Sequence, residues 1–230
     1  RYVEQIRKAA GERIEVRRTS TRHELLEALP NTTHLIGLPL TEEQFRPHLD
    51  HLQWVQLAHS SGDISDVLVL ALESGVRVTS ASTFRAPQVA EHAMALALAM
   101  IRKIDAAVRA QEEHRWAADE ISGAVQTLNG MKLGILSGDR IDDEIARRAR
   151  CFGAHTLALR RLDGTAPESV DEVIDASEID TMVKQSDVLI VAMPRMASTR
   201  NLLNTARVAM MKQTAFLVDV SRSGVVEQEA

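Results

Sequence analysis

The sequence has few of the residues that mark disulfide-rich, nucleic-acid-binding or membrane-spanning proteins. A single cysteine, Cys151, among 230 residues can form neither an intrachain disulfide nor a thiolate metal site, so a reducing, cytoplasmic compartment is expected. Lys and Arg number 27 against 32 Asp and Glu, which leaves no basic surface for a phosphate backbone. The longest apolar run, 93–101, is far shorter than the roughly 20 residues that cross a bilayer. We therefore expect no nucleic-acid and no membrane partner.

Aromatic residues are also scarce, at 3% of the chain, whereas apolar residues of all kinds make up 45%. The hydrophobic core must therefore be built from aliphatic side chains. Such a composition suits buried parallel strands packed against alanine-rich helices.

The first third of the chain alternates short strand patterns with helical patterns, which indicates an α/β fold with a parallel sheet. A sheet of this kind begins with a strand, yet the first pattern is helical, so we expect the first strand to be missing. The expected helices are 2–10, 21–28, 42–48 and 65–74, and the expected strands are 13–18, 34–38, 54–58 and 77–80.

A long helix is expected from Pro87 to about Arg109, because proline suits the first helical position, where its missing N–H costs nothing. The run 93–101 would make this helix apolar on every side, so it should be buried all round. We place the domain junction just before it, which gives domains at 1–83 and 84–230. A single small domain could not cover such a helix, so we expect a homodimer through 87–109.

A second strand and helix series follows the long helix. The helix expected at 140–152 has acidic residues in its first turn and arginines near its end, which complement the helix dipole, and Gly153 supplies a left-handed stop. The expected strands are 132–137, 156–160, 187–193 and 215–220, and the other expected helices are 178–185 and 204–211.

A dinucleotide-binding sheet holds its cofactor where its first strand runs directly into a helix. Glycines there let the backbone approach the pyrophosphate, and the helix N-terminus attracts it. In the second series this segment reads Leu133-Gly134-Ile135-Leu136-Ser137-Gly138-Asp139-Arg140-Ile141-Asp142. Here the chain resembles the D-isomer-specific 2-hydroxyacid dehydrogenases, a family that includes glyoxylate/hydroxypyruvate reductases and phosphoglycerate dehydrogenase.

The resemblance is collinear and covers nearly the whole chain. Each matching segment alone is weak, but together, in this order and spacing, they are specific: 52–56, 87–92, 128–135, 186–194, 199–204 and 218–224. The resemblance implies two doubly wound parallel-sheet domains, a flavodoxin-like substrate domain and a Rossmann nucleotide-binding domain, incomplete at both ends. It also implies a dimer and hydride transfer between a nicotinamide cofactor and a small 2-oxo acid.

The resemblance places the arginine that grips the substrate at Arg222. A permanently charged planar fork can hold a 2-oxo acid at two points and stabilise a developing alkoxide. The alternative is an exposed arginine after a strand end. The loop Ser60-Ser61-Gly62 corresponds to the family's carboxylate-binding turn, although Ser61 stands where glycine is usual.

For the cofactor, the resemblance implies a site formed by Gly138, Asp139, Arg140, Ile141, Met193, Pro194, Thr199 and Val220. Arg160 and Arg161 stand where an acidic residue would accept the ribose hydroxyl of NAD. Two cations at that edge suit a 2′-phosphate, so NADP is expected over NAD. A solvated pair at a strand end is the alternative.

Several departures from the family pattern weaken the expectation of an active enzyme. Ser137, Asp139 and Asp142 replace the fingerprint glycines, and the carboxylate of Asp139 would repel a pyrophosphate. The acidic residues would alternatively cap their own helix. The family's glutamate and general-acid histidine would follow Ala230, so the chain as given is expected to be inactive.

The histidines give no other site. His59, beside the substrate loop, is expected to have a packing or solvated role, and the pair His48 and His51 lacks a third ligand, so no metal is expected. Two hypotheses remain. One is a reductase of glyoxylate-like or hydroxypyruvate-like acids, and the other is a degenerate, non-catalytic homologue that serves as a dimeric binding or structural module.

Overall fold

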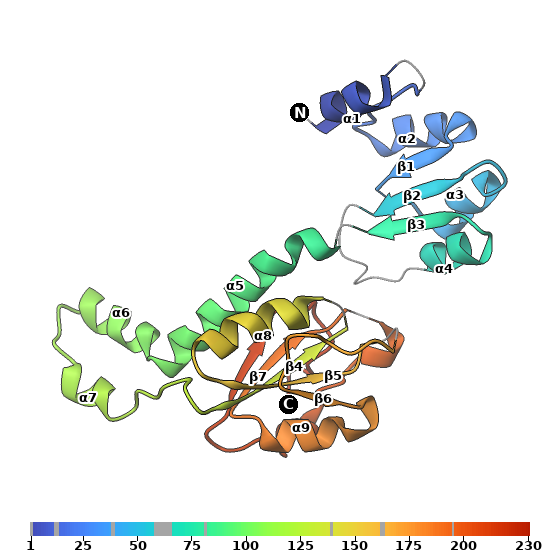
Figure 1. Cartoon of the computed structure of the whole chain (residues 1–230). Helices are drawn as coiled ribbons and strands as arrows, with labels where there is room; N and C mark the ends of the chain where they lie inside the picture. The colour runs from blue at the N-terminus through green and yellow to red at the C-terminus, as the bar shows by residue number, and fades with distance from the viewer. Residues whose placement is uncertain are drawn as a thin grey trace. The chain divides into compact units, whose positions relative to one another are not determined.

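A computed structural model describes residues 2–11, 14–37, 40–57, 66–80, 82–138, 140–161, 164–194 and 196–230. The described residues of 2–57 and 66–79 form one compact unit, and those of 80–230 form a second (Figure 1). The units contain parallel sheets of three and five strands, which confirms the α/β fold class. Within the described residues, no helix is long and apolar enough to cross a membrane.

The first unit is a three-stranded sheet with helices between its strands. Its strands lie in the order β1 (His34–Ile36), β2 (Trp54–Leu57) and β3 (Arg77–Ser80), with His34 paired to Trp54. Its helices are α1 (Tyr2–Ala10), α2 (Arg22–Ala28), α3 (Glu42–Phe45) and α4 (Asp66–Glu73). Alternation along the strands buries Leu35 and Val55 in one core with the fully buried Leu29 and Phe45.

The strand expected at 13–18 is wrong over its described residues. Residues 14–18 have no regular secondary structure, and Ile14 remains half exposed. Val16 is the only other apolar residue of 14–18, and Glu15, Arg17 and Arg18 are charged, so the segment has little apolar surface for a sheet to bury.

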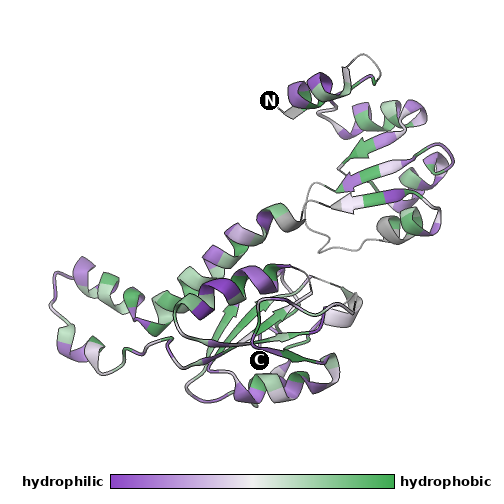
Figure 2. Cartoon of the chain, in the orientation of Figure 1, coloured by the Kyte–Doolittle hydropathy of each residue, from purple (hydrophilic) through white to green (hydrophobic). Residues whose placement is uncertain are grey.

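The second unit is built on a five-stranded parallel sheet in the order β6-β5-β4-β7-β8. The strands are β4 (Lys132–Ser137), β5 (His155–Leu159), β6 (Glu172–Ile174), β7 (Val188–Ala192) and β8 (Phe216–Asp219). Figure 2 shows how strongly apolar the central strands are, and every residue of β7 is buried. The expected strands at 132–137, 156–160, 187–193 and 215–220 are therefore present, whereas short β6, with Glu172 exposed, had no apolar pattern to reveal it.

Helices cover both faces of this sheet. On one face, α5 (Ser82–Ile101) and α8 (Ile141–Cys151) pack over Leu133, Ile135 and Ile190. On the other, α9 (Ile179–Gln185) packs over Leu136 and Leu189, and α10 (Thr205–Val208) adjoins it. Packing there is tight, because a Cβ atom added to Gly134 would lie 2.3 Å from Ser186 Oγ.

The long helix differs from the one expected. It begins at Ser82, so Pro87 lies inside it, and it ends at Ile101, after which Lys103 adopts a left-handed conformation (φ 55°). The chain continues as α6 (Ile104–Glu112) and α7 (Ala118–Ser122). At the break, the carbonyl of Ile101 accepts the backbone N–H of Gln126, a residue distant in sequence, at 3.0 Å.

The helix α5 is buried on one face and not all round. Ala93, Ala97 and Ile101 are buried, whereas Leu96 is 38% exposed. The expectation of all-round burial is therefore not met within a single chain. The helix α8 follows the expected bounds closely, and Gly153 ends it with φ +77°.

Candidate functional site

The candidate site is the carboxyl edge of the five-stranded sheet, where the strand order reverses around β4. Strand β5 lies on one side of β4 and β7 on the other, and ligands of open α/β sheets bind outside such a switch point. The pairing places Ser137 beside Ala192, and the backbone N–H of Val220 donates to the carbonyl of Val191 at 2.9 Å. The segments at Gly138, Met193-Pro194 and Val220 are thus adjacent.

The helix α8 starts directly behind this edge, with Arg140 as its N-cap and Ile141 as its first residue. Its first turn carries a buried carboxylate of the helix itself. Asp142, fully buried, accepts a hydrogen bond from the backbone N–H of Asp143 at 2.7 Å. One of the donors that a pyrophosphate would use therefore already has a partner.

The buried carboxylate of Asp142 is also held by Arg161 from the end of β5. Arg161 Nε lies 3.1 Å and Nη2 2.7 Å from the two carboxylate oxygens, and Nη2 also contacts Asp143. Only 9% of the Arg161 side chain is exposed. Asp143 in turn accepts the backbone N–H groups of Glu168 and Ser169, each at 2.8 Å, so the loop after β5 is fastened to α8.

These contacts shift the protonation equilibria of the cluster. Hydrogen bonding to Asp142 raises the pKa of the Arg161 guanidinium, which keeps it charged. Burial raises the pKa of Asp142 above its usual value, although Arg161 opposes this. Burial also raises the pKa of Asp143, but the N–H of Ser169 and the Arg161 guanidinium outweigh it, so that pKa is lowered.

Arg160, the neighbouring residue, has a different environment. Its side chain is 46% exposed, and its Nε donates to Asp175 Oδ1 at 2.9 Å, with Asp175 itself 61% exposed. The two arginines that the sequence placed together are thus separated by the structure into one buried and one exposed cation.

The loop after β7 is held by its own hydrogen bonds. Thr199 is buried, and its hydroxyl donates to the carbonyl of Pro194 at 2.6 Å and accepts the N–H of Met196 at 2.9 Å. Met193 is also buried. Thr199 therefore holds the backbone of Pro194 and Met196 through its hydroxyl.

The loop that carries Arg222 is fixed at both ends. Asp219 accepts the N–H of Ser221 at 2.8 Å, and the N–H of Asn201 donates to the carbonyl of Gly224 at 2.8 Å. Gly224 has φ +99°, a conformation that favours glycine. Arg222 lies between these two anchors, with its side chain exposed at the carboxyl edge.

Four of the expected site residues, Ser60, Ser61, Gly62 and Asp139, lie outside the described residues, as does His59. Among the described residues, no group of three or more His, Cys, Asp or Glu side chains could hold a metal ion.

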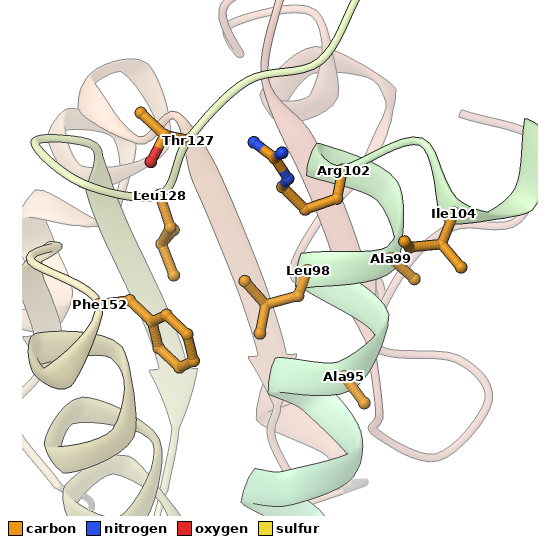
Figure 3. Close-up of a pocket in the computed structure, with 8 residues that line it drawn as sticks. All are labelled: Ala95, Leu98, Ala99, Arg102, Ile104, Thr127, Leu128 and Phe152. Atoms are coloured by element: carbon orange, nitrogen blue, oxygen red, sulfur yellow. The ribbon is translucent and has the colours of Figure 1, made fainter. Parts of the chain in front are cut away.

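A separate pocket of about 610 Å³ lies away from the carboxyl edge, where α5 ends (Figure 3). Phe152, the C-cap of α8, is half exposed and lines this pocket. Arg102 stands at its wall, with Nη1 donating to the carbonyl of Gln126 at 3.0 Å. The remaining lining residues are Ala95, Leu98, Ala99, Ile104, Thr127 and Leu128.

Comparison with known proteins decides the family. Residues 94–230, more than half of the chain, match the D-isomer specific 2-hydroxyacid dehydrogenase NAD binding domain. The chain belongs to the D-isomer specific 2-hydroxyacid dehydrogenase family. It is 34% identical to hydroxypyruvate reductase of Thermotoga maritima over 70% of this chain and 50% of that protein. It is 29% identical to D-3-phosphoglycerate dehydrogenase of Mycobacterium bovis over 96% of this chain and 42% of that one.

This dehydrogenase-family chain thus spans about half the length of the curated relatives it matches. Its fold is that of solved structures such as an acyclic imino acid reductase in complex with NADPH and D-Arg. The two structures match with a TM-score of 0.80 at 21% sequence identity. The match covers 100% of this chain and 73% of the reductase chain.

The switch point of this dehydrogenase-family chain has the strand order at which open α/β sheets bind dinucleotides, but the first turn of α8 carries the buried Asp142 paired with Arg161. The ends of β4, β7 and β8 lie side by side at this edge. The paired Asp142 and Arg161 were not expected to contact each other. The only sequence signal was an acid in place of a fingerprint glycine together with a base after the next strand.

Proposed function

We propose that this protein is an oxidoreductase that transfers a hydride between NADP(H) and a small 2-oxo acid of the glyoxylate or hydroxypyruvate type. The observation that supports this best is the switch-point edge, where Gly138, Pro194 and the Arg222 loop follow three adjacent strands. Family membership and the similarity to a hydroxypyruvate reductase support the substrate class.

In this proposal Arg222 binds the substrate. Its guanidinium holds the carboxylate and carbonyl oxygens of a 2-oxo acid and stabilises the negative charge that develops on the carbonyl oxygen. Val220 and the Met193-Pro194 segment flank the nicotinamide, which supplies the hydride when it is bound. Ser60, Ser61 and Gly62 offer backbone N–H groups to the substrate carboxylate.

The preference for NADP rests on positive charge at the end of β5, where the family's NAD-binding members need an acidic residue. Exposed Arg160 supports it directly. Arg161 supports it less than the sequence indicated, because its guanidinium is buried and bound to two carboxylates.

We further propose that the protein is a cytoplasmic homodimer through the helical segment 87–109. Apolar side chains on its outer face support this, since Leu96, Ile104 and Val108 are 38%, 50% and 46% exposed. Large exposed apolar side chains of this kind occur at interfaces between protein chains.

A second candidate function, a non-catalytic binding or structural module, is favoured by one observation. The carboxylate of Asp142 takes the N–H of Asp143, and Arg161 neutralises that carboxylate within the fold. The helix N-terminus is thereby satisfied without a cofactor phosphate.

Titration of the unmodified chain with NADPH, followed by glyoxylate, separates the two functions. We expect saturable NADPH binding and then glyoxylate binding that Arg222→Gln weakens about tenfold or more, because a charge-assisted bond is lost. Arg200→Gln, an exposed arginine of the β7 loop, is the matched control. Absence of NADPH binding at millimolar concentration would reject the oxidoreductase and favour the module.

A further inference from the structure

Two consecutive arginines follow β5, and the structure gives them opposite surroundings. The side chain of Arg161 is 9% exposed, whereas that of Arg160 is 46% exposed. A bound phosphate must reach a guanidinium from solvent, so exposure alone already distinguishes the two residues.

The hydrogen-bonding capacity of Arg161 is directed into the fold. Its Nε and Nη2 form a bidentate pair with Asp142, and Nη2 also contacts Asp143. Two carboxylates face this one guanidinium, so their combined charge is net negative and repels an incoming phosphate. To bind a phosphate through Nε and Nη2, Arg161 would have to leave Asp142 buried and unpaired, which proteins strongly disfavour.

The same contacts give Arg161 a different task. Asp142 and Asp143 belong to the first turn of α8, and Asp143 also holds the backbone N–H groups of Glu168 and Ser169. Arg161 therefore joins the end of β5, the start of α8 and the loop 168–169. It is suited to position the backbone of the nucleotide edge.

Arg160 has the properties that Arg161 lacks. Among the described residues its one ion-pair partner is Asp175, through Nε at 2.9 Å, and that pair is exposed on both sides. An exposed ion pair contributes little to stability, so the guanidinium can exchange one carboxylate for a doubly charged phosphate ester. The backbone N–H of Arg160 donates to the carbonyl of Ile174 at 2.8 Å. This bond fixes the backbone of Arg160 at the sheet edge.

We propose that Arg160 alone determines selectivity for the 2′-phosphate of an adenine dinucleotide, and that Arg161 is a positioning residue that joins α8 to β5. This inference rests on the proposed function, because it assigns the adenosine end of the same site.

The adenosine end can be tested without the nicotinamide by calorimetric titration with 2′,5′-ADP and with 5′-AMP, which differ only in the 2′-phosphate. We expect the unmodified chain to bind 2′,5′-ADP at least about tenfold more tightly. Arg160→Ala should remove this preference and leave the urea midpoint of unfolding unchanged. Arg161→Ala, the adjacent matched control, should lower the urea midpoint and keep the preference.

If Arg161→Ala does not fold, the double variant Asp142→Ala/Arg161→Met provides the control, because it removes both charges of the buried pair. Retention of the 2′-phosphate preference in that variant supports the inference. Loss of the preference there, or its survival in Arg160→Ala, overturns the division of roles. A parent chain that binds both nucleotides equally also overturns it but leaves the nucleotide site standing, whereas a parent that binds neither rejects the proposed function together with the inference.

Discussion

At the scale of single residues, the buried Asp142 and Arg161 explain each other. An aspartate without exposed surface at a glycine position of the fingerprint would be costly alone, and so would a nearly buried arginine. Together they form a bidentate pair, and Arg161 Nη2 also donates to the carboxylate of Asp143. A buried pair of this kind is strongly coupled, although it need not be more stable than an apolar pair of the same volume.

This coupling predicts a non-additive pattern of stability. Asp142→Ala leaves Arg161 without its main partner and should lower the free energy of unfolding by about 3 kcal/mol. The double variant Asp142→Ala/Arg161→Met removes both charges and should recover most of that loss. Urea unfolding followed by far-ultraviolet circular dichroism measures both, together with the single variant Arg161→Met. A double variant that loses the sum of the two single effects would show that the residues act independently.

The residue scale also shows the limit of sequence reasoning about the site. Arg222 and Arg160 lie at the carboxyl edge, as their places after β8 and β5 predict. The pairing of Asp142 with Arg161 joins residues 19 apart in sequence, which only the packing of α8 beside β5 brings together.

At the scale of elements, β5 and β6 are tied by a side-chain link next to their ladder. Asp171 accepts hydrogen bonds from the backbone N–H and the hydroxyl of Thr156, both at 2.8 Å. Its Oδ1 also lies 3.3 Å from Nε of Arg150 in α8. The N–H bond from Thr156 is the main cause that lowers the pKa of Asp171. The link thus joins two strands and a helix through one ionised carboxylate.

The lowered pKa of Asp171 predicts how stability depends on pH. Since the folded pKa lies below the unfolded value of about 4, the contribution is complete above pH 4 and is lost as the pH falls through the folded value. The gap in unfolding free energy between the parent and Asp171→Asn should therefore be wide at neutral pH and narrow in acid. Asp175→Asn, at the other end of β6, is the control for loss of charge. A gap that does not change with pH would contradict the assignment.

Element prediction succeeded where the apolar pattern was strong and failed where a contact distant in sequence intervened. The strand 132–137 was placed correctly because β4 is buried along nearly its whole length. The helix expected to run to Arg109 ends at Ile101 because Gln126, far along the chain, binds the carbonyl there. No local pattern contains that contact.

At the scale of the whole molecule, the homodimer proposal concerns the outer face of α5 and α6. Leu96, Ile104 and Val108 remain exposed there, and the pocket beside Phe152 lies at the same end of α5 (Figure 3). Burial of these side chains against a second copy would gain roughly 25 cal/mol per Å² of apolar surface.

We therefore expect light scattering at micromolar concentration to give twice the mass of one chain. The double variant Leu96→Glu/Val108→Glu should give a monomer, because it would bury carboxylates at the interface. Ile36→Glu, at an apolar position of the first unit that is 54% exposed, is the control and should leave the dimer intact. A parent chain that is monomeric would refute the interface.

The sequence by itself determined the alternation of strand and helix, the aliphatic core and the resemblance to a dehydrogenase family, because each depends on local pattern or collinear order. It also determined which residues follow the strand ends. Only the tertiary structure decided that Arg161 faces inward and Arg160 outward, and that α5 is buried on one face. The physical reason is that side-chain partners and solvent exposure depend on which segments pack together, and neighbouring residues of one chemical type can therefore acquire opposite roles.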